Sequence, residues 1–452
     1  MKKVLSLFLT LILAFGMTLS VCAAEPSSVS SGVTEIQKYG NLVLDIAPDT
    51  LHAAGWEFGD LLNITVDGRA YQAPLCTNYS DVDTGSMVLR ESKGTLILAI
   101  NMGDFATSQG IAAKVTAEDG SISWEFPEGK SMSDISVTLT MGEKGGYRNQ
   151  YLLHQLKRTD ERADYSSDAV FANFRSISGG SIGQNVLFRS SSPANNELGR
   201  ASYADALAKT AGIQTVLNLA DGQEAFESYI AANDFASPYY LSLYQNGSIK
   251  LLNLGIDYTS ADYKMGLADG LRFLTVNKGP YLVHCNEGKD RAGFVSALLS
   301  CLMGADYDQI VNDYMISYEN YYHLEAGSEQ YEAVKNSNIV SILSTITGVS
   351  DPAKLKKADL SAAAEAYIKA IGLTDEEINA LKANLSQDCP EPAVVTDSVQ
   401  TYTVISGDCL SHISRKLYGT DTNWKAIWKE NEDLIRDPNV IYCGQVLTIP
   451  AA

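Results

Sequence analysis

The residues best suited to chemistry lie in one short segment, residues 279–293, with the sequence GPYLVHCNEGKDRAG. The apolar residues 281–283 predict a buried β-strand, and a helix is predicted to begin near Arg291. Cys285 therefore stands at the start of a short loop that contains Gly288 and leads into a helix. Such a loop points successive backbone N–H groups inward and makes a site for a tetrahedral dianion. The spacing predicts a phosphate-binding loop with a nucleophile at its base.

Each residue type in this loop suits the hydrolysis of a phosphomonoester. The field that binds phosphate at a helix start also stabilises the thiolate of Cys285, which is the nucleophilic form of cysteine. The planar fork of Arg291 can bind two phosphoryl oxygens at once, which lysine cannot copy. Attack by sulfur gives a phosphoryl-cysteine that water then hydrolyses. The residues expected to bind phosphate are Asn286, Glu287, Gly288, Lys289 and Arg291.

A bare Cys-x5-Arg spacing is a weak signal, but the His-Cys pair, the glycine and the strand–loop–helix context make coincidence a poor explanation. His284-Cys285-x-x-Gly-Lys-Asp-Arg resembles the signature loop of the cysteine-dependent phosphatases, and is closest to the secreted bacterial tyrosine phosphatases with dual protein and phosphoinositide activity. The resemblance implies an α/β cysteine-phosphatase fold over residues 147–388. Further matching segments are Asn173-Phe174-Arg175 with Gly179-Gly180, Leu187-Phe188-Arg189-Ser190, GIQTVLNL at 212–219 and IGLTDEEI at 371–378.

The resemblance also assigns roles within the loop. Related bacterial enzymes protonate the leaving group with the aspartate inside the loop, here Asp290, and this is the assignment we favour. Conventional tyrosine phosphatases use an aspartate on a mobile upstream loop, a role that Asp257 or Asp262 could fill. In related lipid phosphatases a lysine at the position of Lys289 accompanies multiply phosphorylated substrates, so phosphoinositides and inositol phosphates are candidates beside phosphotyrosine. His284 is expected to orient the loop rather than to carry a proton.

Four positions depart from the family pattern. Ser176 replaces an aspartate, and Asn218 and Ala220 replace the Asp and Arg of an Asp-Leu-Arg motif. Ala292 stands where most members carry Thr or Ser, whose hydroxyl helps the thiolate to leave as the intermediate breaks down. The absence of this hydroxyl predicts slower turnover, and does not by itself imply inactivity.

Other conspicuous residues have structural interpretations. Arg175 and Arg189 are expected to be fold-stabilising ion-pair partners, with direct contact to substrate as the alternative. A cluster of tyrosines at helical spacing predicts packing rather than a substrate cage. Its members are Tyr307, Tyr314, Tyr318, Tyr321 and Tyr322.

A separate small module follows a linker at residues 389–400. The opening Gly407-Asp408-x-Leu410 and the closing GQVLTIP at 444–450 resemble the LysM module almost end to end. Over residues 401–450 the resemblance implies a βααβ unit that binds N-acetylglucosamine-containing glycans, usually peptidoglycan. Cys409 and Cys443 fall near the sheet ends, where the sequence allows either a disulfide or two free thiols.

Residues 33–145 have the pattern of an all-β domain. Apolar residues alternate with Ser and Thr over 135–141, and Asp67-Gly68 between two strand-like runs predicts a hairpin. The run TLILAIN at 95–101 predicts a buried strand. Tyr39-Gly40-Asn41 and the INMG sequence at 100–103 resemble the C-terminal barrel of S-adenosylmethionine hydrolases and halogenases. Because nothing in the chain resembles that family's catalytic domain, the resemblance implies a fold and no activity.

Charge and targeting signals bound the remaining functions. The 452 residues carry a formal charge of −20, which repels nucleic acids and anionic membrane surfaces. The basic start, the apolar residues 4–17 and Val21-Cys22-Ala23-Ala24 predict an export signal over residues 1–24, with cleavage favoured over a lipid anchor on Cys22. No later apolar run is long enough for a transmembrane helix. The cysteine and histidine spacings predict no disulfide framework and no metal site, and no cofactor is expected.

Together these features predict an exported phosphatase associated with a Gram-positive-type cell wall. Its expected partners are a phosphorylated protein, lipid or inositol phosphate, and peptidoglycan through the LysM module. One alternative is a tethered binding protein whose phosphatase fold only recognises phosphorylated ligands, and another is a structural wall protein. Intact Cys285, Gly288 and Arg291 argue against both alternatives.

Overall fold

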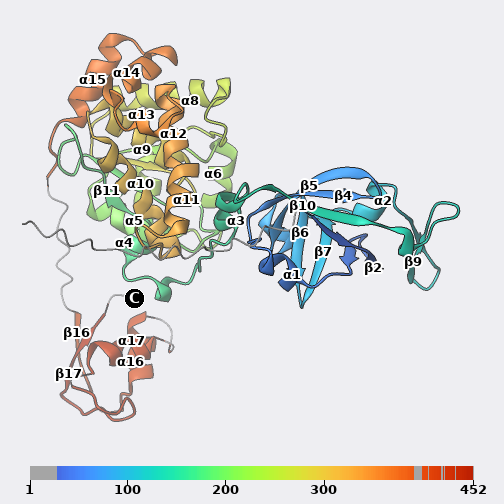
Figure 1. The fold of residues 1–452 in the computed structure, drawn as a ribbon. Helices are drawn as coiled ribbons and strands as arrows, with labels where there is room; N and C mark the ends of the chain where they lie inside the picture. The colour runs from blue at the N-terminus through green and yellow to red at the C-terminus, as the bar shows by residue number, and fades with distance from the viewer. Residues whose placement is uncertain are drawn as a thin grey trace, which may run out of the picture. The chain divides into compact units, whose positions relative to one another are not determined.

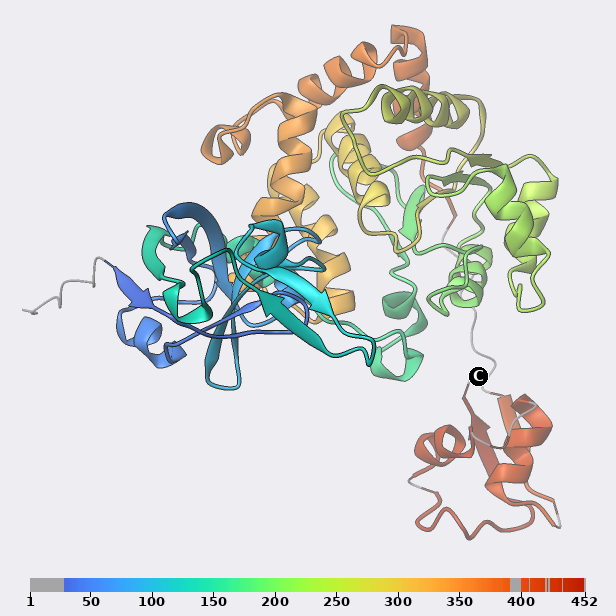
Figure 2. The same ribbon diagram turned by 90° about the vertical axis from the view of Figure 1, so that its right-hand side faces the viewer.

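The computed structural model describes residues 28–390, 400–405, 407–418, 421, 423–432 and 434–450. The predicted export signal and most of the predicted linker lie outside these residues. Two compact units are distinguished, residues 1–157 with 326–337, and residues 158–325 with 338–452. Their helices and strands can be followed in Figure 1, and from another side in Figure 2.

The first unit is built around an eight-stranded sheet, as the all-β prediction requires. The strand order is β1-β10-β4-β5-β6-β7-β3-β2, and β5 with β6 is the one parallel pair within this sheet. The strands are β1 (Val29–Ser31), β2 (Val33–Ile36), β3 (Leu42–Leu44), β4 (Leu61–Val66), β5 (Arg69–Cys76), β6 (Met87–Ser92), β7 (Thr95–Ile100) and β10 (Val137–Glu143). A separate hairpin joins β8 (Ala113–Thr116) to β9 (Ile122–Glu125), and the short helices are α1 (Pro48–Ala53), α2 (Phe105–Ser108), η1 (Tyr79–Asp81) and η2 (Met132–Asp134).

Local sequence explains this sheet. Asp67 and Gly68 both have positive φ, 48° and 80°, which is the backbone that a two-residue hairpin between β4 and β5 needs. The alternating pattern holds in β10, where Val137 and Leu139 are buried. The run 95–100 forms β7, with four successive buried residues. All three sequence predictions are confirmed.

One helix of the first unit comes from much later in the chain. α11 (Glu329–Ser337) packs against α3 (Arg148–His154), which follows the last strand of the sheet. Arg148 donates to both carboxylate oxygens of Glu329, at 2.7 and 2.6 Å. Ala333 completes a buried cluster that contains Leu152 and Val43. Residues 326–337 therefore belong to this unit, and the buried side chains of α11, among them Ala333, contribute to its core.

The second unit contains a five-stranded sheet in the order β11-β12-β15-β13-β14. β12 (Leu187–Ser190), β15 (Tyr281–His284), β13 (Thr215–Asn218) and β14 (Ile249–Leu251) are parallel, and β11 (Arg175–Ser176) adds an antiparallel edge. β15 is central and buried along its whole length. The strand predicted at 281–283 is confirmed, and the apolar and β-branched residues 215–217 lie in β13.

Helices surround this sheet. α5 (Ala201–Thr210), α6 (Gln223–Ile230) and α7 (Pro238–Gln245) bury apolar residues in one cluster with Phe188, Val216 and Leu282. α9 (Arg291–Leu302) is packed by α10 (Tyr307–Tyr322), α12 (Ile339–Thr347) and α14 (Leu360–Ala370), and α8 (Ala261–Val276) by α15 (Asp375–Leu385). The shorter elements are η3 (Arg162–Asp164), α4 (Asp168–Phe171) and α13 (Pro352–Leu355).

The sequence predicts a helical segment over residues 359–386 that Gly372 divides, with a capped restart at TDEE, residues 374–377. Gly372 lies between α14 and α15, and its φ of 110° is accessible mainly to glycine. Thr374 caps α15 by accepting from the Glu377 N–H, while the Glu377 carboxylate accepts from the Thr374 N–H. The predicted capped restart is confirmed.

The C-terminal module has the predicted βααβ order. β16 (Gln400–Thr403) pairs antiparallel with β17 (Val446–Ile449), and α16 (Leu410–Tyr418) and α17 (Trp424–Glu430) lie between them in sequence. Ile413, Ile427 and Leu447 are fully buried in its own small core. Cys409 and Cys443 are free thiols in the structure.

Across the parts that the structure describes, no helix is long and apolar enough to cross a membrane. In the same residues no three His, Cys, Asp or Glu side chains are grouped as a metal site would require.

Candidate active site

Cys285 lies at the carboxyl end of β15, the central strand of the parallel sheet. β12 and β13 flank it, in register so that His284 pairs with Ser190 on one side and Asn218 on the other. In parallel sheets this edge is where ligands bind, because the loops that follow the strands meet there. Cys285 is 3% exposed and is followed directly by the loop that leads into α9.

The carbonyl groups of the loop are held by buried polar side chains behind it. Arg189 donates to the Gly288 carbonyl through Nε at 3.1 Å and Nη2 at 2.8 Å, and Nη2 also donates to the Lys289 carbonyl at 3.0 Å. The amide of Asn173 donates to the carbonyls of Glu287 and Gly288, at 3.2 and 3.3 Å. Both side chains are fully buried, so they act on the loop and do not reach a ligand.

The remaining carbonyls of the loop are also occupied. The Ser192 N–H donates to the Asn286 carbonyl at 3.0 Å, and the Tyr321 hydroxyl donates to the Glu287 carbonyl at 2.6 Å. Within the described residues, the N–H groups of residues 286–289 have no acceptor. The loop thus turns its carbonyls to the protein and leaves its N–H donors for an anion.

Gly288 is the residue that permits this close packing. Its φ is 67°, in the left-handed region that favours glycine. A Cβ at this position would lie 2.2 Å from the carbonyl oxygen of Ser190 and 2.7 Å from the Ser191 nitrogen. Because both atoms are backbone, no side chain fits here without moving the loop away from β12.

A buried ion-pair cluster fixes the position of Arg189. Asp313 on α10 accepts from Arg189 Nη1 at 2.7 Å and from Arg175 Nε at 2.8 Å. Burial by itself would raise the pKa of the Asp313 carboxyl, but the two guanidinium groups outweigh burial and hold the pKa below its ordinary value. Arg175 also donates to the Asn173 side chain at 2.7 Å. The predicted ion-pair arginines therefore share one carboxylate and support the loop from behind.

His284 is fully buried beside the nucleophile and hydrogen-bonds through Nε2 to the Tyr240 hydroxyl at 2.7 Å. Burial lowers the pKa of His284 to about 3, so the ring is neutral at physiological pH. The same hydroxyl accepts from the Asn218 amide at 3.1 Å. Asp205 in turn accepts from the Tyr240 N–H at 2.6 Å, which fixes the start of α7. A neutral His284 in this network can orient the loop and cannot act as a cationic acid.

Arg291 begins α9 and is partly exposed. Its Nη1 donates to the Leu254 carbonyl at 2.8 Å, which ties the guanidinium to the segment after β14. Tyr258 in that segment stacks on Phe294 of α9, with ring centroids 4.7 Å apart. Burial is the main cause that raises the pKa of Tyr258 above its ordinary value, and the nearby charges of Asp290 and Cys285 raise it further. Tyr258 thus packs on α9 and lies near Asp290 and Cys285.

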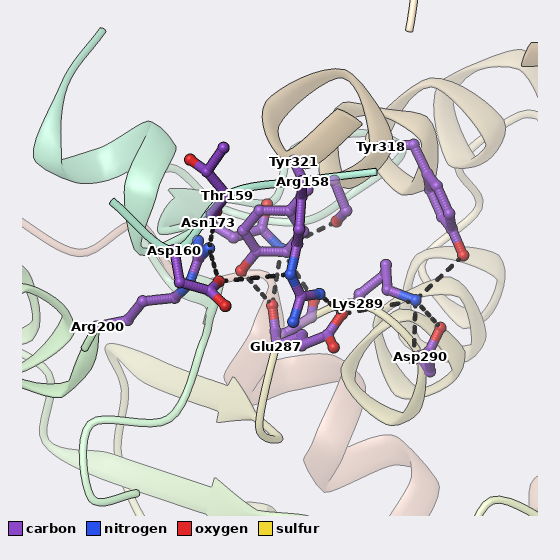
Figure 3. Close-up of polar contacts among 12 residues, drawn as sticks. Arg158, Thr159, Asp160, Asn173, Arg200, Glu287, Lys289, Asp290, Tyr318 and Tyr321 are labelled. Atoms are coloured by element: carbon purple, nitrogen blue, oxygen red, sulfur yellow. Dashed lines mark hydrogen bonds and ion pairs between the residues drawn. The ribbon is translucent and has the colours of Figure 1, made fainter. Parts of the chain in front are cut away.

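Lys289 and Asp290 form an ion pair at the other side of the loop. Lys289 Nζ lies 2.9 Å from Asp290 Oδ1, and 5.1 Å from the centre of the Tyr318 ring. Figure 3 shows the ammonium between Asp290 and Tyr318. Burial opposes the charge of Lys289, but Asp290 and Glu287 outweigh burial and raise the pKa of the ammonium. The side chain of Asp290 is 43% exposed and so remains accessible to a ligand.

The two upstream aspartates are in a different environment. Asp257 is exposed and accepts from the N–H and hydroxyl of Thr259, at 3.0 and 2.7 Å. These hydrogen bonds lower the pKa of Asp257, so its carboxyl group favours the ionised form and is less suited to donate a proton. Asp262 is exposed in the first turn of α8. Of the three aspartates considered from the sequence, Asp290 is the one inside the loop.

Comparison with known proteins agrees with this arrangement. Residues 170–387 match the family described as the tyrosine phosphatase family. The chain contains a tyrosine phosphatase family domain. Residues 402–450 match the LysM domain, and residues 32–117 match the C-terminal domain of the SAM hydroxide adenosyltransferases. The layout suspected from the sequence is confirmed.

Individual relatives cover only parts of the chain. A tyrosine-protein phosphatase from Nostoc commune is 28% identical over 141 residues, which are 26% of this chain and 42% of the relative. The potassium binding protein Kbp from Escherichia coli is 41% identical over 63 residues, 14% of this chain and 42% of the relative. This chain therefore spans less than half the length of either relative. A solved structure of an uncharacterized conserved protein from Thermotoga maritima matches 26% of this chain and 37% of its own, at 20% identity and a TM-score of 0.20. This likeness is too small to support an argument.

Several residues that build the tyrosine phosphatase family domain's loop were not assigned a role from the sequence. From the sequence, Asn173 lies only in a segment that matches the family, and Tyr321 belongs to the tyrosines that are expected to pack. Asp313 and Tyr240 gave no signal, because their partners lie 124 and 44 residues away along the chain. Their roles follow only from the fold, which brings α10 and α7 to the end of the sheet.

Proposed function

We propose that residues 158–325 and 338–388 of the second unit form a phosphomonoesterase that works through a phosphoryl-cysteine intermediate. The observation that carries the proposal is the loop after β15, whose carbonyls are all bound by the protein while the N–H groups of residues 286–289 have no acceptor within the described residues. This loop can bind a phosphoryl group directly above Cys285. Arg291 at the helix start can bind two of its oxygens through the guanidinium.

The chemistry can be written for these residues. The Cys285 thiolate attacks phosphorus, the P–O bond to the leaving group breaks, and Asp290 gives its proton to the leaving oxygen. Water then attacks the phosphoryl-cysteine, Asp290 takes its proton, and the thiolate leaves with inorganic phosphate as the product. Before the first step Asp290 must be released from Lys289, so a substrate that binds the ammonium of Lys289 helps to free the acid.

The first test is hydrolysis of p-nitrophenyl phosphate by the full chain under reducing conditions. Cys285→Ser should abolish turnover, whereas Cys301→Ser should not. Cys301 is a matched control because it is also buried in this unit, and burial raises the pKa of its thiol to about 12. Turnover that survives in Cys285→Ser would show that the nucleophile lies elsewhere.

A second candidate function is the recognition of phosphorylated ligands without turnover. Two observations favour it: Asp290 is paired with Lys289 at 2.9 Å, and Ala292 offers no hydroxyl beside the loop. A folded wild-type protein that binds tungstate, an inert phosphate analogue, but hydrolyses no phosphomonoester would establish this function.

The substrate class depends on Lys289. Phosphotyrosine needs one phosphate site and an aromatic wall such as Tyr258, whereas phosphoinositides and inositol phosphates add a second phosphate that an ammonium can bind. Lys289→Gln should lower kcat/KM for a soluble inositol polyphosphate by about tenfold more than for a phosphotyrosine peptide. Equal losses for both substrates would exclude a role for Lys289 in selecting the second phosphate.

We also propose that the chain is exported and held at a cell wall by its LysM module. Ile405, Leu434 and Tyr442 are more than half exposed on the loops that flank the two-stranded sheet, where apolar and aromatic groups can contact sugar rings. Co-sedimentation of the full chain with purified peptidoglycan tests this, with Tyr442→Ala expected to reduce the bound fraction. Export itself is tested by whether the mature protein begins at residue 25.

A further inference from the structure

An arginine from outside the matched phosphatase segment contacts the phosphate loop, which comprises residues 286–290 after β15. Arg158 precedes the matched residues 170–387, yet its Nη1 lies 2.7 Å from Oε2 of Glu287 inside the loop. Figure 3 shows the guanidinium directed at this carboxylate. Arg158 is 18% exposed and Glu287 25% exposed, so the pair is only partly screened by water.

Glu287 creates an electrostatic problem for the loop. A carboxylate beside a site for a phosphate dianion repels the ligand, and this repulsion is strong where solvent is scarce. Lys289 cannot fully offset it, because its ammonium lies 2.9 Å from Asp290 and 3.6 Å from Glu287. Arg158 is therefore the cation closest to the Glu287 carboxylate.

The segment that carries Arg158 is fixed to the same unit. Arg200 donates to the Thr159 carbonyl at 3.2 Å and to the Asp160 carboxylate at 2.7 Å. Its guanidinium is 1% exposed and lies 4.5 Å from the centre of the Tyr321 ring, whose hydroxyl binds the Glu287 carbonyl. Arg200 and Tyr321 thus connect the segment that carries Arg158 with the loop that carries Glu287.

We propose that Arg158 is a positioning residue of the phosphate loop, which neutralises Glu287 and holds its side chain so that the loop accepts an anion. The inference rests on the proposed function in that it takes the loop to be the phosphate site. It places an essential part of that site in the segment ahead of the matched domain. Arg158 acts through Glu287 and does not contact the ligand.

Tungstate binding to the full chain, measured by calorimetry, tests the inference without requiring turnover. Arg158→Gln should weaken tungstate binding by at least about tenfold, because Glu287 then keeps only Lys289, whose ammonium is shared with Asp290. Glu287→Gln should bind tungstate more tightly than the wild type. The double variant Arg158→Gln/Glu287→Gln should return to within about threefold of Glu287→Gln, since no charge remains for Arg158 to offset. Lys157→Gln, which removes the exposed neighbouring cation, is the matched control and should bind as the wild type does.

Each other result overturns the inference. Wild-type affinity in Arg158→Gln would show that Glu287 needs no neutralisation. A double variant as weak as Arg158→Gln would show that Arg158 acts on the anion itself or only supports its segment. A wild-type protein that binds no tungstate would remove the loop as an anion site altogether. A different set of results would contradict the proposed function and leave the role of Arg158 intact. In that case tungstate binds, the variants differ in affinity as expected, and no phosphomonoester is hydrolysed.

Discussion

Arg189 and Gly288 are joined by two hydrogen bonds, from Nε and Nη2 of the guanidinium to the glycine carbonyl, at 3.1 and 2.8 Å. Arg189 is fully buried, and its Nη1 binds Asp313. A charged residue that no ligand can touch therefore holds the loop after β15 at Gly288, where φ is 67°. Only a planar fork can bind one carbonyl twice and a carboxylate on its other side, which makes the position specific for arginine.

Arg189→Lys should lower kcat/KM for p-nitrophenyl phosphate by about 100-fold, because a displacement of the loop by a fraction of an ångström misplaces several N–H donors together. Steady-state kinetics of the full chain measure this. The matched control is Arg272→Lys at a partly exposed ion pair with Glu377, which should change activity little and stability by less than about 1 kcal/mol. Unchanged kinetics in Arg189→Lys would contradict the role given to the fork.

Gly288→Ala should abolish tungstate binding and turnover. The added Cβ would lie 2.2 Å from the Ser190 carbonyl oxygen, so the loop must move away from β12. Gly212→Ala is the control, since Gly212 has nearly the same φ, 64° against 67°, and open space around its Cβ position. The control carries only the backbone strain of about 1–2 kcal/mol and should keep its affinity for tungstate. If both variants lose binding equally, the close approach to Ser190 is not the cause.

Much of the loop's architecture could be predicted from the sequence because its signals are local. The strand, the glycine and the helix start lie within fifteen residues, and the hairpin at Asp67-Gly68 is likewise determined by adjacent residues. The capping box at Thr374 has the same local origin. In each case short-range backbone preferences decide the structure, and tertiary packing agrees with them.

The support behind the loop could not be predicted in the same way. Asp313 and Arg189 are 124 residues apart, and Arg158 and Glu287 are 129 apart, so their pairing depends on how α10 and the segment before α4 pack. The packing of α11 with α3 is equally non-local, because helical periodicity alone does not indicate which unit buries Ala333. Ion pairs such as Asp313 with Arg189 leave no periodic pattern in the sequence, so the partner of each residue cannot be predicted from it.

The neutral state of His284 predicts a pH dependence of stability. Burial lowers its pKa to about 3, whereas a histidine in the unfolded chain titrates near 6.5. Below about pH 6.5 the unfolded state binds a proton that the folded state does not, so the free energy of unfolding falls as pH falls, by up to about 1.4 kcal/mol per pH unit. Urea unfolding at about pH 7 and pH 5 should therefore show a steeper loss for the wild type than for His284→Asn, which cannot titrate. Parallel losses would show that His284 is protonated in the folded protein.

Ala292 predicts which step limits turnover. It is fully buried directly after Arg291. In the proposed mechanism, a hydroxyl at this position would assist departure of the Cys285 thiolate from the intermediate. One hydrogen bond to a charged group contributes about 1.5–3 kcal/mol, so Ala292→Ser should raise the rate of intermediate hydrolysis about tenfold or more. In rapid mixing with p-nitrophenyl phosphate, the wild type should release a burst of nitrophenol before a slow steady state, and Ala292→Ser should raise the steady-state rate without changing the burst rate. Ala297→Ser, at a buried position further along α9, is the control and should leave both rates unchanged. A wild type without a burst, or an Ala292→Ser variant whose steady-state rate is unchanged, would show that a step other than thiolate departure limits the reaction.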